Sequence, residues 1–371
     1  MIDMDALYIH IPFCAQICAY CDFAKEITKP QKRKRYMKNL ITEIQSHESE
    51  LSNVTSIFIG GGTPSILDEE DLVGLFKTLK KSVGLREVID ITIEANPGDV
   101  TPRFAELLKS LGITRVSLGA QSFNEKHLRF LKRTHTPEDI DKAVFNLKEA
   151  GITNINLDLL FAIPGQTLEE LNYDIDRALQ LDLSHVSYYS VIIEEGTALA
   201  LWIDKGLVQP ASENLEASMF ETVIDTLVEK GFNHYEISNF ARPGFESVHN
   251  TMVWKSHDYL GVGTSAHSKW RGRRFYNVKS IKKYNERIEN GEYPVMEHYP
   301  LEPMKDALLM GLRLMNGVDM DWFENRFGVS LLEAFETLHE SLENGLLEIE
   351  KGHLKFTRKG LFLGNEVFMK L

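Results

Sequence analysis

The feature that most constrains the fold is a regular alternation between short β-branched runs and longer amphipathic stretches. The strand-like runs lie at residues 6–11, 54–60, 88–96, 115–121, 154–163 and 185–193. The amphipathic stretches, with apolar residues at three- and four-residue spacing, lie at 35–51, 68–83, 102–112, 136–151 and 168–182. Strands connected by helices predict a parallel sheet. Six units fall short of the eight of a closed barrel, so we predict an α/β fold, an open, partial (β/α)6 barrel of TIM-like type.

Polar or glycine-rich segments follow several of these strands. They are "GGGTPS" at 60–65, "EANPGD" at 94–99, "GAQSF" at 119–123 and "DLLFAIPG" from 158 to 165. Barrel-type folds collect their chemistry at the C-terminal ends of the strands. The pattern therefore predicts a functional site at that end.

The pattern changes after about residue 300. We expect residues 1–300 to form the core with an extension, the core itself ending near residue 235, and residues 301–371 to form a second domain. That domain is predicted to be small, mostly helical and winged-helix-like, with a β-rich wing around Leu347–Phe356. The alternative is a lid that packs on the barrel.

The charge balance narrows the function classes. Lys and Arg together number 41 and Asp and Glu 54, a net charge of −13, which disfavours tracking a phosphate backbone. The basic run "KPQKRKRYMK" is expected to be the solvated start of a helix. The first residues carry acids where a secretory signal needs bases, and no apolar run approaches the roughly 20 residues of a membrane span. We therefore expect a cytoplasmic protein that binds no nucleic acid.

The cysteine complement is concentrated in one loop. Cys14, Cys18 and Cys21 are the only three cysteines and lie within eight residues, just after the first strand. A structural zinc site needs four closed ligands, and neither a second cysteine pair nor His10 supplies the fourth convincingly. A [4Fe-4S] cluster normally takes four cysteines, so three would leave one iron open to a substrate or cofactor. Three incidental thiols so close together are improbable.

The pattern C-x3-C-x-aromatic-C, with Tyr20 as the aromatic residue, resembles the cluster-binding loop of radical S-adenosylmethionine (SAM) enzymes. The resemblance implies a [4Fe-4S] cluster on Cys14, Cys18 and Cys21, with SAM chelating the fourth iron. It also implies reductive cleavage of SAM to a 5′-deoxyadenosyl radical and an electron donor such as flavodoxin or ferredoxin. The partial barrel is the fold of that superfamily.

The same resemblance implies SAM-binding residues. The "GGGTPS" segment is similar to the one that contacts the SAM amino acid moiety, which implicates Gly61, Gly62 and Thr63; the alternative is an ordinary turn. Glu94 ends a strand, where an unpaired carboxylate is costly to bury unless a ribose hydroxyl or an ammonium group satisfies it; its alternative is a helix cap. Tyr8 also matches the family pattern, with a core aromatic as the alternative.

A narrower resemblance concerns Gln121, Arg133 and Asp158. They are similar to residues of the oxygen-independent coproporphyrinogen oxidase-like family that line a second SAM or substrate pocket. An arginine and an aspartate suit a ligand with a carboxylate and an amino or hydroxyl group. The alternative is a salt bridge between Arg133 and Asp158 across the mouth of the barrel.

Two features separate the branches of that family. The oxidase branch has a long extension before the cluster loop and a further cysteine two positions after the third. Here 13 residues precede Cys14, and Phe23 occupies the second position. In both respects, the short segment before Cys14 and the phenylalanine at position 23, the chain resembles the haem-chaperone branch.

A third feature is "HNTMVW", from His249 to Trp254, which resembles the H-N-x-x-Y-W motif of the haem-chaperone branch with Val253 in place of tyrosine. A neutral imidazole is an ordinary axial haem ligand, so the motif implicates His249 in haem binding. Alternative ligands are His267, His257 and His10. The remaining alternative is a histidine satisfied within its loop.

These features together predict a haem chaperone on a radical SAM scaffold. It would bind a [4Fe-4S] cluster, SAM and haem, and pass haem to acceptors such as respiratory enzymes, with transient contact where these are membrane-associated. We expect no coproporphyrinogen dehydrogenase activity, whereas SAM cleavage is compatible with this function. The alternative is an oxygen-independent coproporphyrinogen III dehydrogenase that forms protoporphyrinogen IX. A tRNA- or peptide-modifying radical enzyme is disfavoured by the charge and by the lack of an RNA-binding extension.

Overall fold

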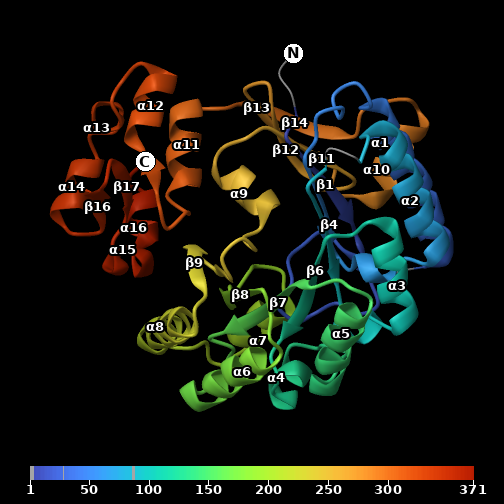
Figure 1. Ribbon diagram of the computed structural model, residues 1–371, viewed down its shortest axis with the longest axis horizontal. Coiled ribbons are helices and arrows are strands. Elements are labelled where there is room, and N and C mark those ends of the chain that lie inside the picture. The colour runs from blue at the N-terminus through green and yellow to red at the C-terminus, as the bar shows by residue number, and fades with distance from the viewer. Residues whose placement is uncertain (1–3, 28, 86–87) are drawn as a thin grey trace.

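The computed structural model describes residues 4–27, 29–85 and 88–371 and is built around one large curved sheet (Figure 1). Six neighbouring strands of that sheet pair in parallel and in chain order. They are β1 (Ala6–Ile11), β4 (Ser56–Gly61), β5 (Asp90–Ala95), β6 (Arg115–Gln121), β7 (Asn154–Phe161) and β8 (His185–Ser190). This confirms the predicted succession of six parallel strands.

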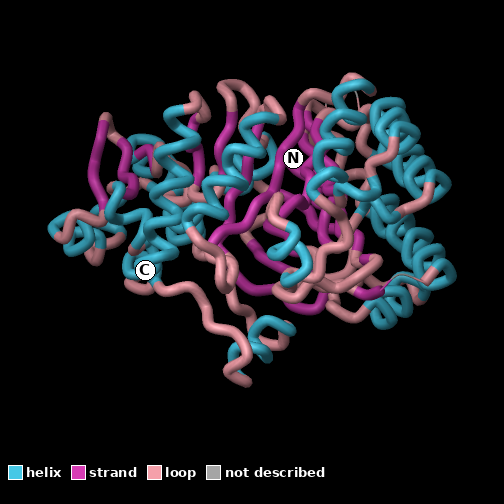
Figure 2. The backbone as a smooth tube through the Cα atoms, turned by 90° about the horizontal axis from the view of Figure 1, so that it is seen from below, coloured by secondary structure: helices cyan, strands magenta, loops and turns pink. Residues whose placement is uncertain are grey.

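Helices follow these strands and cover the outer face of the sheet, as Figures 1 and 2 show from two directions. They are α1 (Pro30–Ser46), α2 (Glu69–Ser82), α3 (Pro102–Leu111), α4 (Glu125–Phe130), α5 (Pro137–Glu149), α6 (Leu168–Gln180), α7 (Ala198–Asp204) and α8 (Glu213–Glu229), with short 3-10 turns at Pro64–Ile66 and Pro97–Asp99. Helix α1 begins at Pro30, within the basic run that was expected to open it, because the fixed φ of proline suits the first turn, and it ends five residues before the expected end at 51. Helices α4, α7 and α8 were not anticipated.

The two faces of the parallel strands differ in chemistry. Outward-facing side chains such as Ile57, Val116 and Ile155 are fully buried in the main hydrophobic core against the helices. The alternate positions are polar and also buried, among them Ser117 and Asn156, which hydrogen-bond to each other inside the barrel at 2.7 Å. The concave side is therefore lined for polar contacts rather than filled with aliphatic side chains.

Further strands extend both edges of the parallel sheet. On one edge β11 (Tyr259–Val262) pairs in parallel with β1, and β12 (His267–Trp270), β13 (Arg273–Asn277) and β14 (Val295–Pro300) follow antiparallel. On the other, β10 (Asn239–Ala241) and β9 (Asn233–Glu236) run antiparallel beyond β8. Within the described residues this makes a 12-stranded sheet in which β1 and β8 do not pair, so the barrel is open, as predicted.

Three smaller elements complete this part of the molecule. The cysteine loop starts with β2 (Phe13–Cys14), which pairs in parallel with β3 (Glu26–Ile27). Helix α9 (Val248–Trp254) lies between β10 and β11 in the chain, and α10 (Ile281–Glu289) packs beside α1. The segment that contains α9 thus connects the β8 edge of the sheet to its β1 edge.

The C-terminal unit has a hydrophobic core of its own, with Leu308, Phe323 and Leu354 fully buried in it. Its elements are α11 (Pro303–Gly311), β15 (Val318–Asp319), α12 (Met320–Phe327), α13 (Leu331–Ala334), α14 (Leu338–Glu343), β16 (Leu347–Glu350), β17 (His353–Phe356), α15 (Arg358–Phe362) and α16 (Gly364–Phe368). Strands β16 and β17 form the wing predicted around Leu347–Phe356. Figure 1 shows the unit beside β9 and α8.

Candidate functional site

A pocket of about 480 Å³ lies at the C-terminal ends of the parallel strands. All six parallel strands contribute to it, either through their C-terminal residues or through the loops that follow them, as the sequence pattern predicted. Among the predicted residues, those that line it are Cys14, Cys18, Tyr20, Cys21, Gly61, Gly62, Thr63, Glu94, Gln121, Arg133 and Asp158. None of its lining residues comes from the C-terminal unit, so within the described chain that unit does not act as a lid on this pocket.

The three cysteines are free thiols at the edge of the pocket. The Cys14 sulfur accepts a hydrogen bond from Thr63 Oγ1 at 3.5 Å, and the Cys18 sulfur accepts one from Arg133 Nη1 at 3.2 Å. Burial raises the pKa of the Cys14 and Cys21 thiols, because the low-dielectric surroundings disfavour thiolates. Lys25 lies beside Cys21 and donates to its carbonyl oxygen.

This donor set fits an iron–sulfur cluster better than a single ion. In the described part of the chain, no group of three or more His, Cys, Asp or Glu side chains gathers closely enough to hold one metal ion. A cluster needs its thiolates spread more widely, because each binds a different iron. The cations of Arg133 and Lys25 stand where they would offset the negative charge of bound thiolates.

The glycines after β4 are required by close packing. Gly61 has φ = +114°, and a Cβ there would lie 2.5 Å from the His10 ring. A Cβ on Gly62 would lie 2.8 Å from the carbonyl oxygen of Phe13. The end of β4 can therefore reach the cysteine loop only without side chains, and any ligand contact by these glycines would be made by their backbone.

Glu94 is short of hydrogen-bond donors. Its carboxylate accepts one bond from the backbone N–H of Gly61 at 3.0 Å. Burial and then the nearby charge of Asp158 raise the pKa of Glu94 to about 7. The helix-cap alternative is wrong, because Thr101 caps α3. An ammonium or hydroxyl group of a ligand in the pocket would supply the missing donors.

Arg133 and Asp158 form hydrogen bonds with different partners. Arg133 Nη2 donates to the carbonyl oxygen of Gly119 at 2.7 Å and to Asn96 Oδ1 at 2.5 Å. The carboxylate of Asp158 accepts from Ser117 and Asn156, each at 2.8 Å. The salt bridge between Arg133 and Asp158, which was the alternative explanation, is not formed in the structure.

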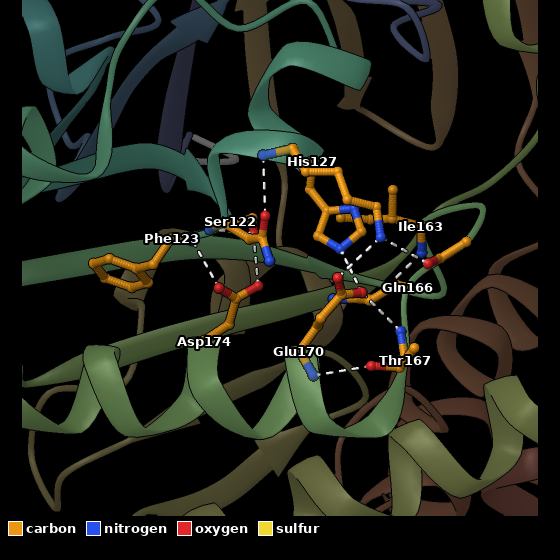
Figure 3. A network of polar contacts seen from close by, with 11 residues as sticks. Ser122, Phe123, His127, Ile163, Gln166, Thr167, Glu170 and Asp174 are labelled. Atoms are coloured by element: carbon orange, nitrogen blue, oxygen red, sulfur yellow. Dashed lines mark hydrogen bonds and ion pairs between the residues drawn. The ribbon is translucent and has the colours of Figure 1, made fainter.

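A buried polar network fastens the loop after β6 to α6, as Figure 3 shows. Asp174 of α6 accepts from Ser122 Oγ and from the backbone N–H of Phe123, both at 2.7 Å. Glu170, one turn earlier, accepts from His127 Nε2 of α4 at 3.0 Å. Gln121, the last residue of β6, has φ = +68°, and this network holds the chain immediately after that strained residue.

Tyr8 does not line the pocket. It pairs with Phe58 in the sheet register, two residues before the level of Glu94 along the strands. Its ring stacks on that of Phe58, with the ring centroids 6.2 Å apart. Its hydroxyl contacts His10 Nδ1 at 3.0 Å. Tyr8 is half-buried and is not part of the hydrophobic core, and burial together with the charge of Glu94 raises its pKa. Its role in SAM binding stays a prediction.

His249 lies at the opposite end of the barrel. Its Nδ1 is 3.2 Å from the hydroxyl of Ser56, the first residue of β4, whereas the pocket lies at the last. Five residues of strand separate the two ends by roughly 16 Å. The His249 side chain is 5% exposed, packs against Phe58 and has its pKa lowered to about 4 by burial. Its role as a haem ligand stays a prediction, and it would require α9 to move.

The alternative histidines do not line the pocket, although His10 lies directly behind Gly61, which does. His10 is buried, and its Nε2 contacts the carbonyl oxygen of Ala24 at 2.9 Å. His257 Nδ1 contacts Asp5 at 3.0 Å, and the exposed His267 stacks on Tyr276. No histidine is among the described residues that line the pocket.

Several lining residues were missed. The end of β8 contributes Tyr189 and Ser190, the loop after it contributes Ile192 and Glu194, and the loop after β5 contributes Asn96. The β8 loop matches none of the motifs quoted above, so its position after the sixth strand was the signal that could have found it.

Comparisons with known proteins agree along the whole chain. The model of the radical SAM superfamily matches residues 8–178, and that of the HemN C-terminal domain matches residues 300–363. The chain is 38% identical over 372 residues to "Heme chaperone HemW" of Lactococcus lactis subsp. lactis (strain IL1403), covering 99% of this chain and 97% of that protein. It is 36% identical to "Heme chaperone HemW" of Bacillus subtilis (strain 168), covering 98% of each.

Among solved structures, the coproporphyrinogen III oxidase HemN of Escherichia coli, described as a radical SAM enzyme, superimposes with a TM-score of 0.84. The match covers 100% of this chain and 90% of that chain at 22% identity, which shows a common fold. In the part of this chain that the structure describes, no helix has the length and apolar character of a membrane span.

Proposed function

We propose that this chain, which belongs to the radical SAM superfamily and within it to the family of the HemW haem chaperones, binds haem and delivers it to haem-accepting proteins. The observation that carries the proposal is its similarity to two proteins of that name over 97% and 98% of their lengths. A pocket with three free thiols on one loop supports it.

Membership of the superfamily implies a [4Fe-4S] cluster and SAM. We propose that Cys14, Cys18 and Cys21 hold the cluster, with Arg133 bonded to the Cys18 sulfur as a countercharge. Glu94, which has a single backbone donor, would accept from an amino or hydroxyl group of SAM. When bound and reduced, the cluster supplies one electron to the sulfonium of SAM. That electron would come from a flavodoxin- or ferredoxin-type donor, which is part of the proposal.

The runner-up function is coproporphyrinogen III dehydrogenation. The likeness to HemN favours it, although at 22% identity it extends to the fold alone. Against it stands Phe23, which occupies the position of the further cysteine in the oxidase branch and leaves this loop with three thiols. Arg133 and Asp158, the proposed second pocket, are both already engaged in bonds within the barrel.

The two functions make opposite predictions in one experiment. The protein is purified anaerobically, its cluster is reconstituted, and haem titration is followed by absorbance beside an assay of coproporphyrinogen III consumption. We expect stoichiometric haem binding, transfer to a haem-free acceptor and no turnover. Turnover without a stable haem spectrum would establish the dehydrogenase instead. As a control, Cys14→Ala, Cys18→Ala and Cys21→Ala variants should each lose the iron–sulfur absorbance.

A further inference from the structure

The mouth of the pocket carries large apolar side chains that are open to solvent. Ile17 and Phe23 of the cysteine loop are 42% and 63% exposed, and Ile192 of the loop after β8 is 67% exposed. All three line the same pocket, and we call them the apolar rim. Clustered exposed apolar groups around a concave site mark a place where a partner covers them.

The two loops of the apolar rim are fastened to each other. The backbone N–H of Leu199, in the first turn of α7 directly after the β8 loop, donates to the carbonyl oxygen of Ala19 at 2.8 Å. Tyr20 of the cysteine loop and Val191 of the β8 loop also pack against one small buried cluster. Because the loops are joined, the apolar rim is held as one surface before any ligand arrives.

Below the apolar rim the pocket is polar, with Glu94, Ser117 and Asp158 in its walls. Its volume of about 480 Å³ is modest by the scale of small-molecule sites, and the cluster and SAM of the proposed function would occupy it. A third ligand as large as haem therefore has room at the mouth, against the apolar rim, rather than inside.

Cationic groups stand beside the apolar rim. Lys132 lines the pocket with an exposed side chain, and its ammonium group lies over the Trp202 ring, 5.1 Å from the centroid. Its backbone has φ = +58°, and its carbonyl oxygen accepts a bond from Gln16 of the cysteine loop at 2.9 Å. Asp22 and Glu194 line the same mouth, so attraction for a carboxylate is confined to the position of Lys132.

From these contacts we propose that the apolar rim is the haem-binding surface, an inference that rests on the proposed haem-chaperone function. The flat porphyrin ring would lie against Phe23 and Ile192, and one propionate would reach Lys132. Because no histidine is among the described lining residues, apolar contact would supply most of the affinity. Such a ligand would leave the surface easily, as transfer to an acceptor requires.

The test compares single substitutions in the cluster-loaded, SAM-bound protein. Phe23→Asp and Ile192→Asp should each weaken haem binding about tenfold or more, since each removes a large apolar contact and leaves a charge under the ring. The matched control is Phe145→Asp on α5, a phenylalanine with the same 63% exposure that does not line the pocket. It should bind haem like the wild type. Ile192→Asp lies outside the cysteine loop, so it tests the surface even where Phe23→Asp disturbs the cluster.

Each outcome decides one point. Wild-type haem affinity in both rim variants would overturn the inference while leaving the chaperone function intact. Retained affinity with lost transfer would also overturn it, because the apolar rim would then dock the acceptor protein. A wild-type chain that binds no haem would instead overturn the proposed function itself.

Discussion

At Gly61 the absence of a side chain allows the end of β4 to pack against the His10 ring and to approach the cysteine loop. Gly61→Ala should lower the free energy of unfolding by about 3 kcal/mol or more, since φ = +114° is strained for alanine and the new Cβ would lie 2.5 Å from the His10 ring. Chemical denaturation measures the change. Gly112→Ala, at φ = +86° with open space around it, is the control and should cost only about 1 kcal/mol. Equal losses in the two variants would contradict a role for the contact with His10.

Single residues were predictable where a motif met a strand end. The cysteines and Glu94 were found because the C-terminal ends of parallel strands converge, and the structure brings these residues to one pocket. His249 matched a motif equally well, but its surroundings come from Ser56 and Phe58, which are far away in the sequence. Contacts with residues so distant in the sequence leave no pattern around position 249 from which its burial could be predicted.

At the scale of elements, a chain of hydrogen bonds crosses the barrel interior from β7 to the start of α9. Asn156 Oδ1 contacts His185 Nδ1 at 2.6 Å, and His185 Nε2 contacts the hydroxyl of Tyr235 at 2.9 Å. That hydroxyl also accepts from the backbone N–H of Ser247 at 3.1 Å, and Ser247 caps α9.

Tyr235→Phe tests this chain. It should cost about 1–3 kcal/mol of unfolding free energy, because it strands a ring nitrogen of His185 and the N–H of Ser247. Hydrogen exchange should show faster opening of α9 than in the wild type. The control is Tyr173→Phe. Tyr173 is exposed on α6 and its hydroxyl accepts a hydrogen bond from Arg177, so the variant should change the free energy of unfolding by about a few tenths of a kcal/mol. An unchanged α9 in Tyr235→Phe would show that the chain does not hold this helix.

A second element-scale prediction concerns Glu43 of α1. Its buried carboxylate accepts from the N–H of Gly263, from Asn277 and from the hydroxyl of Tyr284 in α10. Burial outweighs these donors and raises its pKa from 4.5 to about 7. The unfolded chain therefore releases this proton first as pH rises. The stability due to this group is fully present below pH 4.5 and is lost by about pH 7, by about 3 kcal/mol.

Glu43→Gln removes that titration. Denaturation at pH 5 and at pH 8 should show the variant losing less stability between the two values than the wild type. Other buried carboxylates titrate in both proteins, so the difference between the two isolates Glu43. A parallel pH dependence in wild type and variant would contradict the raised pKa.

Element boundaries were predictable to the extent that they depend on local pattern. Strand β1 was expected at 6–11 and β6 at 115–121, and both were found there because the first run ends at Pro12 and the second at the polar residues Gln121 and Ser122. The edge strands β9 to β14 were not predicted. They are short, and they owe their position to pairing with β1 and β8 rather than to their own periodicity.

At the scale of the whole molecule, a buried ion cluster joins the C-terminal unit to the large sheet. Asp306 of α11 accepts from Lys269 of β12 at 2.7 Å and from Arg274 of β13, and both Asp306 and Lys269 have only 6% of their side chains exposed. Burial alone would raise the pKa of Asp306, but the hydrogen bonds from Lys269, Ser256 and Arg274 and the charge of Lys269 together outweigh it, and the pKa is lowered. The contribution of Asp306 to stability is therefore present above its unfolded pKa and is lost in acid.

Asp306→Ala should cost about 3–5 kcal/mol at neutral pH, because it leaves two cations in the interface without their counterion. Limited proteolysis should then cut near residue 300 sooner than in the wild type. Arg358→Ala is the matched control. It removes an exposed ion pair with Asp225 that also joins the C-terminal unit to α8, and it should cost at most about 1 kcal/mol. Because the two pairs bridge the same units and differ in burial, similar losses would mean that the number of contacts between the units, and not the buried charge of Asp306, holds them together.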